Sequence, residues 1–159
     1  MHRPIPLSLT ALALVAASAS GARAQGATGA MAAVSRGALV WNEAKVPGFD
    51  PGMKIAGIHG NPDSAGAYTL RLSFPDGYRF PPHWHPMAEN VTVLEGTLLL
   101  AMGERVQESS LKSYGVGDYL HLPATQPHYG GARGYTVLQL HGLGPFTINV
   151  VTQPGVGNR

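Results

Sequence analysis

Short runs of apolar residues, many of them alternating with polar ones, recur from about residue 38 to residue 151. Gly, Pro, Asn and Asp separate the runs roughly every 8 to 12 residues, a spacing typical of β-sandwiches and barrels. No window of about a dozen residues keeps a helical apolar stripe free of Gly and Pro. The pattern therefore predicts an all-β fold, with strands at 38–43, 53–59, 67–74, 78–85, 90–95, 97–102, 118–122, 135–141 and 146–151.

The segments between these runs contain residues that favour chain reversal. Turns are predicted at 61–63, 75–77, 95–96 and 115–118. The most polar internal stretch, 104–115, is expected to be a surface loop.

The first 24 residues are expected to be a signal peptide. A short polar start containing Arg3 precedes an apolar run at 5–17, and Ala22-Arg23-Ala24 provides a small-x-small cleavage site. The alternative is a membrane anchor, but the run is shorter than the roughly 20 residues needed to cross a bilayer. Cleavage near Ala24 would make this a secreted or periplasmic protein that is not inserted in the membrane.

The remaining chain is expected to fold as one domain, because its length suits a single core. The predicted organisation is a signal peptide at 1–24, a flexible arm rich in Gly, Ala and Ser at 25–37, a barrel domain at 38–153 and a tail at 154–159.

Composition narrows the possible chemistry. Loss of Arg3 and Arg23 with the leader leaves nine basic and nine acidic residues, so no basic surface for nucleic acid or for a membrane is expected. The chain has no cysteine, which excludes disulfides and a thiol nucleophile. Chemistry must therefore come from His, carboxylates, Tyr, Ser or a bound cofactor.

One segment has the spacing of a metal-chelating strand. It reads Gly77, five residues, His83-Trp84-His85, three residues, Glu89, six residues, Gly96. Alternate residues of a strand share a face, so His83 and His85 would lie about 7 Å apart along it and could share one metal ion. Pro86 favours a bend directly after the pair, which would let Glu89 begin a neighbouring strand and bring its carboxylate across the two imidazoles.

A second segment reads Gly117, five residues, Pro123, four residues, His128. It would supply a fourth ligand, His128, from a distant strand. Imidazole and carboxylate ligands suit divalent transition metals, whereas calcium prefers oxygen ligands alone.

The two segments resemble the signature motifs of the cupin superfamily, Gly-x5-His-x-His-x3-4-Glu-x6-Gly and Gly-x5-Pro-x-Gly-x2-His-x3-Asn. The first motif matches at every fixed position. In the second, Thr125 stands at the second Gly and Ala132 at the Asn, while His128 is kept. The wider pattern, including Gly144-Pro145-Phe146, is similar to that of small exported single-domain cupins with no assigned function.

The resemblance implies a double-stranded β-helix, that is, a jelly-roll barrel, with His83, His85, Glu89 and His128 converging on one metal inside it. Fe, Mn, Ni, Cu and Zn all remain possible. Four protein ligands would leave coordination positions open on a six-coordinate ion. The resemblance also implies a homodimer paired through edge strands.

The leading functional hypothesis is a mononuclear metal-dependent enzyme, of oxygenase, isomerase or lyase type, that acts on a small oxygen-rich organic substrate. Glu89 would then have a catalytic role in taking a substrate proton besides binding the metal. The alternative is a non-catalytic cupin that binds or senses a metal or a small molecule.

Three further polar residues are candidates to line the pocket behind the ligands. His121 lies in the strand that approaches the second segment, and His141 closes a strand that contains Gln139. Each could orient a ligand or carry a proton.

Overall fold

The strands of this protein pair edge to edge, and every pair is antiparallel. The structure, a computed structural model, describes residues 31–152; the expected signal peptide at 1–24, the arm up to residue 30 and the tail at 154–159 lie outside the described residues. The described residues from Ala32 to residue 152 form one compact unit. Its elements are η1 (Arg36–Ala38), β1 (Asn42–Glu43), β2 (Lys54–His59), β3 (Gly66–Phe74), β4 (Arg79–Trp84), β5 (Glu89–Met102), η2 (Glu108–Ser110), β6 (Lys112–Tyr114), β7 (Tyr119–Leu122), β8 (His128–Gly144) and β9 (Asn149–Val150).

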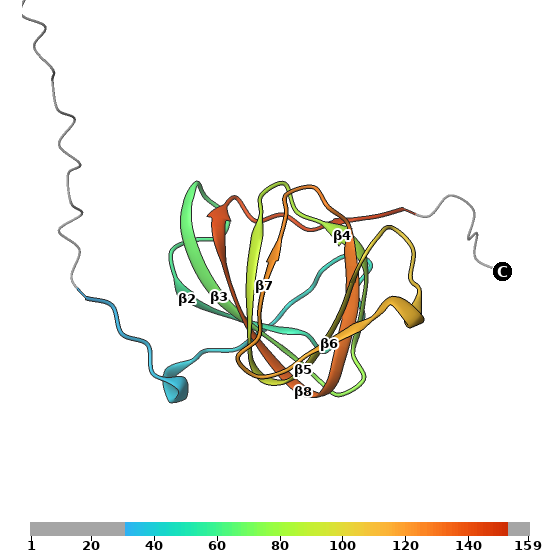
Figure 1. Cartoon of the computed structure of the whole chain (residues 1–159). Coiled ribbons are helices and arrows are strands. Elements are labelled where there is room, and N and C mark those ends of the chain that lie inside the picture. The colour runs from blue at the N-terminus through green and yellow to red at the C-terminus, as the bar shows by residue number, and fades with distance from the viewer. Residues whose placement is uncertain (1–30, 153–159) are drawn as a thin grey trace, which may run out of the picture. The chain divides into compact units, whose positions relative to one another are not determined.

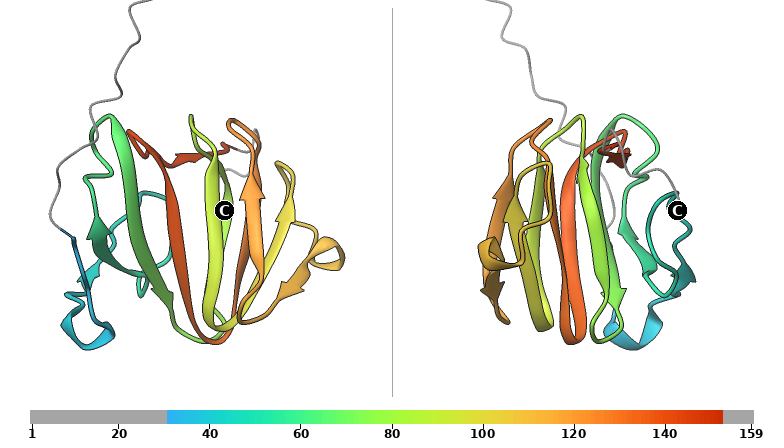
Figure 2. Two further views of the ribbon diagram at one scale, coloured as in Figure 1. Left: turned by 60° about the vertical axis from the view of Figure 1, so that its left-hand side comes forward. Right: turned by 90° about the vertical axis from the view of Figure 1, so that its right-hand side faces the viewer.

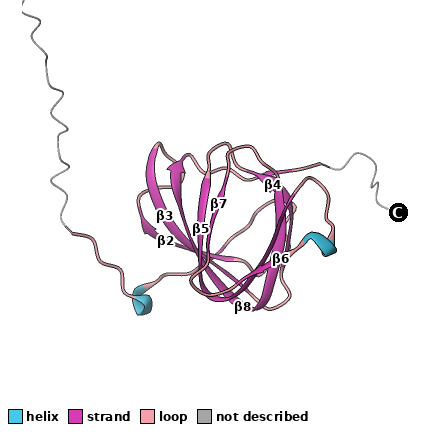
Figure 3. Cartoon of the chain, in the orientation of Figure 1, coloured by secondary structure: helices cyan, strands magenta, loops and turns pink. Residues whose placement is uncertain are grey.

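Two long strands, β5 and β8, form the centre of the sheet. They pair with each other along most of their length. The other edge of β8 pairs first with β4 and then with β3, while the other edge of β5 pairs first with β7 and then with β6. The sheet therefore curls around an interior, as Figures 1 and 2 show, and Figure 3 shows how little helix accompanies it.

The interior is filled by side chains from alternate positions of the central strands. Leu70 on β3 and Val91 on β5 both face Leu140 on β8, while Val93 on β5 faces Leu138 on β8. These residues are nearly inaccessible to solvent, with exposed fractions of 1 to 4%. The period-two apolar pattern thus closes one continuous core, and the predicted all-β jelly-roll barrel is confirmed. No helix within residues 31–152 has the length and apolar character that crossing a membrane would require.

The expected reversal at 95–96 is wrong, because the predicted strands 90–95 and 97–102 are one strand, β5. The register of β5 against β8 shifts on both sides of Glu95, as in a bulge. Gly96 has a φ of 73°, and a Cβ there would lie 2.3 Å from the Tyr135 carbonyl oxygen. Gly96 therefore lets the strand bend without ending.

Two other boundaries also differ. Strand β8 begins at His128 instead of at 135, and the polar stretch 104–115 contains the short strand β6 as well as the turn η2. The first part of β8 and the strand β6 both pair with β5. Residues whose own sequence pattern predicts a loop therefore become strand through pairing with β5.

Thr125, which stands at a glycine position of the second motif, has the left-handed backbone conformation that glycine favours. Its φ is 62°, the one positive value among the non-glycine residues that the structure describes. Its backbone N–H donates to the carbonyl oxygen of His85 over 2.8 Å, so the turn is tied to the first motif. Left-handed backbone is costly for a β-branched residue.

Replacing Thr125 with glycine is therefore expected to raise the free energy of unfolding by about 1 kcal/mol. Urea denaturation of the two proteins would measure the difference. Thr125→Asn should fall between them, because asparagine tolerates this region better than threonine. A destabilised glycine variant would contradict the assigned backbone conformation.

Candidate metal centre

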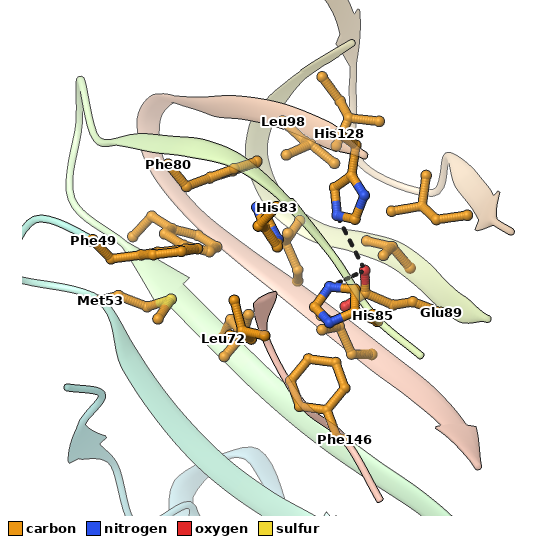
Figure 4. Close-up of a pocket in the computed structure, with 17 residues that line it drawn as sticks. Phe49, Met53, Leu72, Phe80, His83, His85, Glu89, Leu98, His128 and Phe146 are labelled. Atoms are coloured by element: carbon orange, nitrogen blue, oxygen red, sulfur yellow. Dashed lines mark ion pairs between the residues drawn. The ribbon is translucent and has the colours of Figure 1, made fainter. Parts of the chain in front are cut away.

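The four residues singled out by the two motifs meet inside the barrel. His83 lies near the end of β4, His85 follows that strand directly, Glu89 begins β5 and His128 begins β8. His83 and His128 are cross-strand partners, so their side chains share the inner face. The chain bends at Pro86, as expected, and returns with Glu89 beside the imidazoles (Figure 4).

The histidines are close enough to bind one ion. Each of His83, His85 and His128 offers a ring nitrogen, and these atoms all lie within 4.8 Å of one another. The Glu89 Oε2 atom lies 3.5 Å from Nε2 of His85 and 3.8 Å from Nε2 of His128. All four side chains are buried, with exposed fractions between 3% and 6%.

Backbone carbonyls orient the three rings. Nδ1 of His83 lies 2.8 Å from the Pro81 oxygen, and Nδ1 of His85 lies 2.9 Å from the Thr147 oxygen. Nδ1 of His128 makes the same kind of contact, 3.2 Å from the carbonyl oxygen of Gln126. A carbonyl oxygen can only accept, so each Nδ1 carries the hydrogen and each neutral ring presents a free lone pair at Nε2.

Burial keeps the site uncharged when no cation is present. It lowers the pKa of His83 to about 3, with the neighbouring His128 adding to the effect, and lowers the pKa of His85 to about 4. It also lowers the pKa of His128 and raises that of Glu89 to about 8. At pH 7 the imidazoles are therefore neutral and the Glu89 carboxyl is protonated, so the contacts drawn as dashed lines in Figure 4 do not join opposite charges at that pH.

These residues fit a divalent transition metal. Nε2 of His85 is the one buried side-chain nitrogen or oxygen within residues 31–152 that has no hydrogen-bond partner. A buried lone pair without a partner is costly, and a cation shared with His83 and His128 would satisfy it. Three imidazoles and a carboxylate favour Fe, Mn, Ni, Cu or Zn over calcium.

Aromatic side chains hold two of the imidazoles in place, and the strand pattern did not reveal them. The ring of Phe146 stacks on that of His85, with centroids 4.6 Å apart and planes at 21°. The ring of Phe49 meets that of His83 edge to face at 5.1 Å. Phe146 belongs to the Gly144-Pro145-Phe146 pattern of the sequence, whereas Phe49 lies between strands, where nothing in the pattern marks it.

The three additional candidates do not reach the pocket, which corrects the expectation that they could line it. His121 is flanked by the buried Leu120 and Leu122, and Gln139 and His141 flank the buried Leu140. Because successive side chains of a strand point to opposite faces, these three polar residues face outward. There, Nδ1 of His121 lies 2.9 Å from Oδ1 of Asn90, and Gln139 accepts a hydrogen bond from Nε of Arg71 over 3.3 Å.

Solved structures share this fold. The protein is similar to the polyketide cyclase RemF from Streptomyces resistomycificus, with a TM-score of 0.66 and 18% identity over 78% of this chain and 87% of that one. It is also similar to a putative acetylacetone dioxygenase from Methylibium petroleiphilum, with a TM-score of 0.62 and 17% identity over 81% and 85% of the two chains. A third similar structure is the DMSP lyase DddQ from Ruegeria pomeroyi, with a TM-score of 0.58 and 17% identity over 75% of this chain and 64% of that one.

A family model matches part of the chain as well. No curated protein matches the chain. Residues 70–141, which run from β3 into β8 and contain all four residues of the candidate metal centre, match the family model of the Cupin domain. Together with the jelly-roll fold, this match identifies residues 70–141 as a cupin domain.

Proposed function

We propose that this cupin is a mononuclear metal-dependent enzyme that acts on a small organic molecule bearing oxygen donors. The observation that carries the proposal is Nε2 of His85, a buried nitrogen without a hydrogen-bond partner that lies in a cavity beside the ring nitrogens of His83 and His128. Buried polar atoms of folded proteins are ordinarily hydrogen-bonded, so this exception supports a role in binding a ligand.

In this proposal His83, His85 and His128 hold the metal, and Glu89 completes the ligand set. The bound ion would supply Lewis-acid or redox chemistry at coordination positions that the protein leaves open. The carbonyls of Pro81, Thr147 and Gln126 keep the three rings in their ligating tautomer. The carboxylate of Glu89 lies beside the imidazoles, with Oε2 3.5 Å from Nε2 of His85, so in this proposal it takes a proton from a molecule bound at the metal.

The similar structures support an enzyme without selecting its reaction. A polyketide cyclase, a putative acetylacetone dioxygenase and a DMSP lyase use this fold for different chemistries. Oxygenase, isomerase and lyase activity therefore all belong to the proposal. We further propose, from the leader and the edge strands, that the protein is exported and forms a homodimer.

Metal removal and reconstitution test the proposed function. Elemental analysis of protein purified without chelators is expected to find about one divalent transition metal per chain. Turnover of a panel of enols, hydroxy acids and catechols, followed by oxygen uptake and product mass spectrometry, should stop after chelation and return with the native metal. Metal-independent turnover, or no retained metal, would contradict the proposal. Tight binding across the panel without turnover would favour a non-catalytic sensor.

A further inference from the structure

The cavity at the metal centre has a single polar end. Seventeen residues line it, and the only polar ones are His83, His85, His128 and Glu89. The other thirteen are Phe, Leu, Ile, Val or Met side chains from β3, β4, β5, β7, β8 and the segments around Phe49 and Phe146. Within the described part of the chain, the cavity wall offers no side-chain amide, hydroxyl or cation away from the candidate ligands.

The cavity is also small. Its volume is about 50 Å³, whereas pockets for drug-sized ligands usually measure ~300–1,000 Å³. Phe49, Leu72, Phe146 and Ile148 are the partly exposed apolar residues of the wall, whereas Met53 is buried with 2% exposure. A compact molecule that enters beside these partly exposed side chains and meets the metal with one end must contact hydrocarbon with the other.

We infer that the substrate of this site is a compact molecule whose oxygen atoms are confined to the end that meets the metal and whose remainder is hydrocarbon. This inference rests on the proposed function and narrows it, because an oxygen-rich body does not match the apolar walls. Polyols, sugar acids and zwitterions are excluded as substrates. Each of their additional polar groups would lose its water and find no partner in the wall.

Two α-hydroxy acids with the same chelating head separate the effect of the wall from that of the metal. In 2-hydroxy-3-methylbutanoate the body is hydrocarbon, and in threonate it carries hydroxyls. The affinity of each acid for the metal-loaded protein would be measured by calorimetry. This affinity would then be divided by the affinity of the same acid for the free metal ion. We expect the hydrocarbon acid to bind at least tenfold more tightly, because the buried hydroxyls of threonate would stay unpaired. Equal or tighter binding of threonate would overturn the inference.

Variants of the wall test the same point. Leu72→Asn keeps the shape of the side chain and adds an amide at the cavity opening, so the preference is expected to shrink several-fold. Ile148→Asn makes the comparable change outside any strand, where the fold is less affected. Leu143→Asn is the matched control, because Leu143 is 54% exposed and is not part of the cavity wall. A preference that falls as much in the control as in the wall variants would also overturn the inference.

Xenon tests the wall without any metal. It binds through apolar contact alone, and apolar cavities are known to take it up. In metal-free protein we expect xenon to shift the methyl resonance of Met53, and we expect the shift to weaken in Leu72→Asn. If the protein retains no metal but xenon shifts this resonance, the proposed function fails while the apolar cavity stands. If xenon leaves Met53 unchanged, the inference is overturned whatever the metal content.

Discussion

Replacing His85 with alanine is expected to abolish metal retention and turnover together. The change removes one of three imidazoles whose ring nitrogens lie within 4.8 Å of one another, and it is the imidazole whose Nε2 has no other partner. Removing a residue that only hydrogen-bonds to a metal ligand typically lowers metal affinity 10- to 100-fold. Removing a ligand itself, as in His85→Ala, is expected to lower metal affinity by at least as much. Competition with a chromophoric chelator would measure the affinity, and elemental analysis would measure the metal retained through purification.

His121→Ala is the matched control for this variant. His121 is an exposed histidine on β7 that contacts Asn90 on the outer face of the sheet, so its loss should leave metal affinity unchanged. Circular dichroism and thermal unfolding of the metal-free proteins would show whether His85→Ala keeps its fold. A folded His85→Ala protein with undiminished metal affinity and activity would rule out the proposed centre.

The motifs located the candidate metal centre because its geometry is largely local. His83 and His85 occupy alternate positions around the end of one strand, and a proline bend brings Glu89 back within a few residues. Such relations follow from strand geometry and from the restricted backbone of proline. The position of the distant His128 does not follow from local strand geometry, since its pairing with His83 depends on which strands become neighbours.

Tertiary pairing explains most of what the pattern did not predict. Strand β5 runs through Gly96, where a turn was predicted, and β8 begins at His128, before its predicted start at 135. Both strands extend because each is held by neighbours on both edges. The aromatic contacts of Phe49 and Phe146 join segments far apart in the chain, so local pattern holds no trace of them. The outward direction of His121, in contrast, was predictable, because the leucines on either side of it had to face the core.

Glu89→Gln is expected to change how the stability of the metal-free protein depends on pH. Burial raises the folded-state pKa of Glu89 from 4.5 to about 8, so its stabilising contribution is complete below pH 4.5 and is lost as pH rises to about 8. The lowered histidine pKa values act in the opposite sense, because protonation of the unfolded histidines costs stability until pH is well above 6.5, the ordinary value. This histidine effect is common to both proteins. Between pH 6.5 and 8.5 the unfolding free energy of the wild type should therefore fall by about 2 kcal/mol relative to that of metal-free Glu89→Gln, at about 1.4 kcal/mol per pH unit up to the pKa. Urea denaturation of both proteins at several pH values would measure the difference.

Metal affinity should show the converse dependence on pH. Because a cation must displace the proton of Glu89, wild-type affinity is expected to rise about tenfold per pH unit between pH 6.5 and 7.5 and to level off above about 8. Chelator competition should find a flat profile for Glu89→Gln over this range, with weaker binding at pH 8.5. Glu108→Gln, which removes an exposed carboxylate on η2, is the matched control and should follow the wild type. If Glu89→Gln retained the wild-type slope, the displaced proton would not be that of Glu89, and this carboxylate would lose its assigned place in the ligand set.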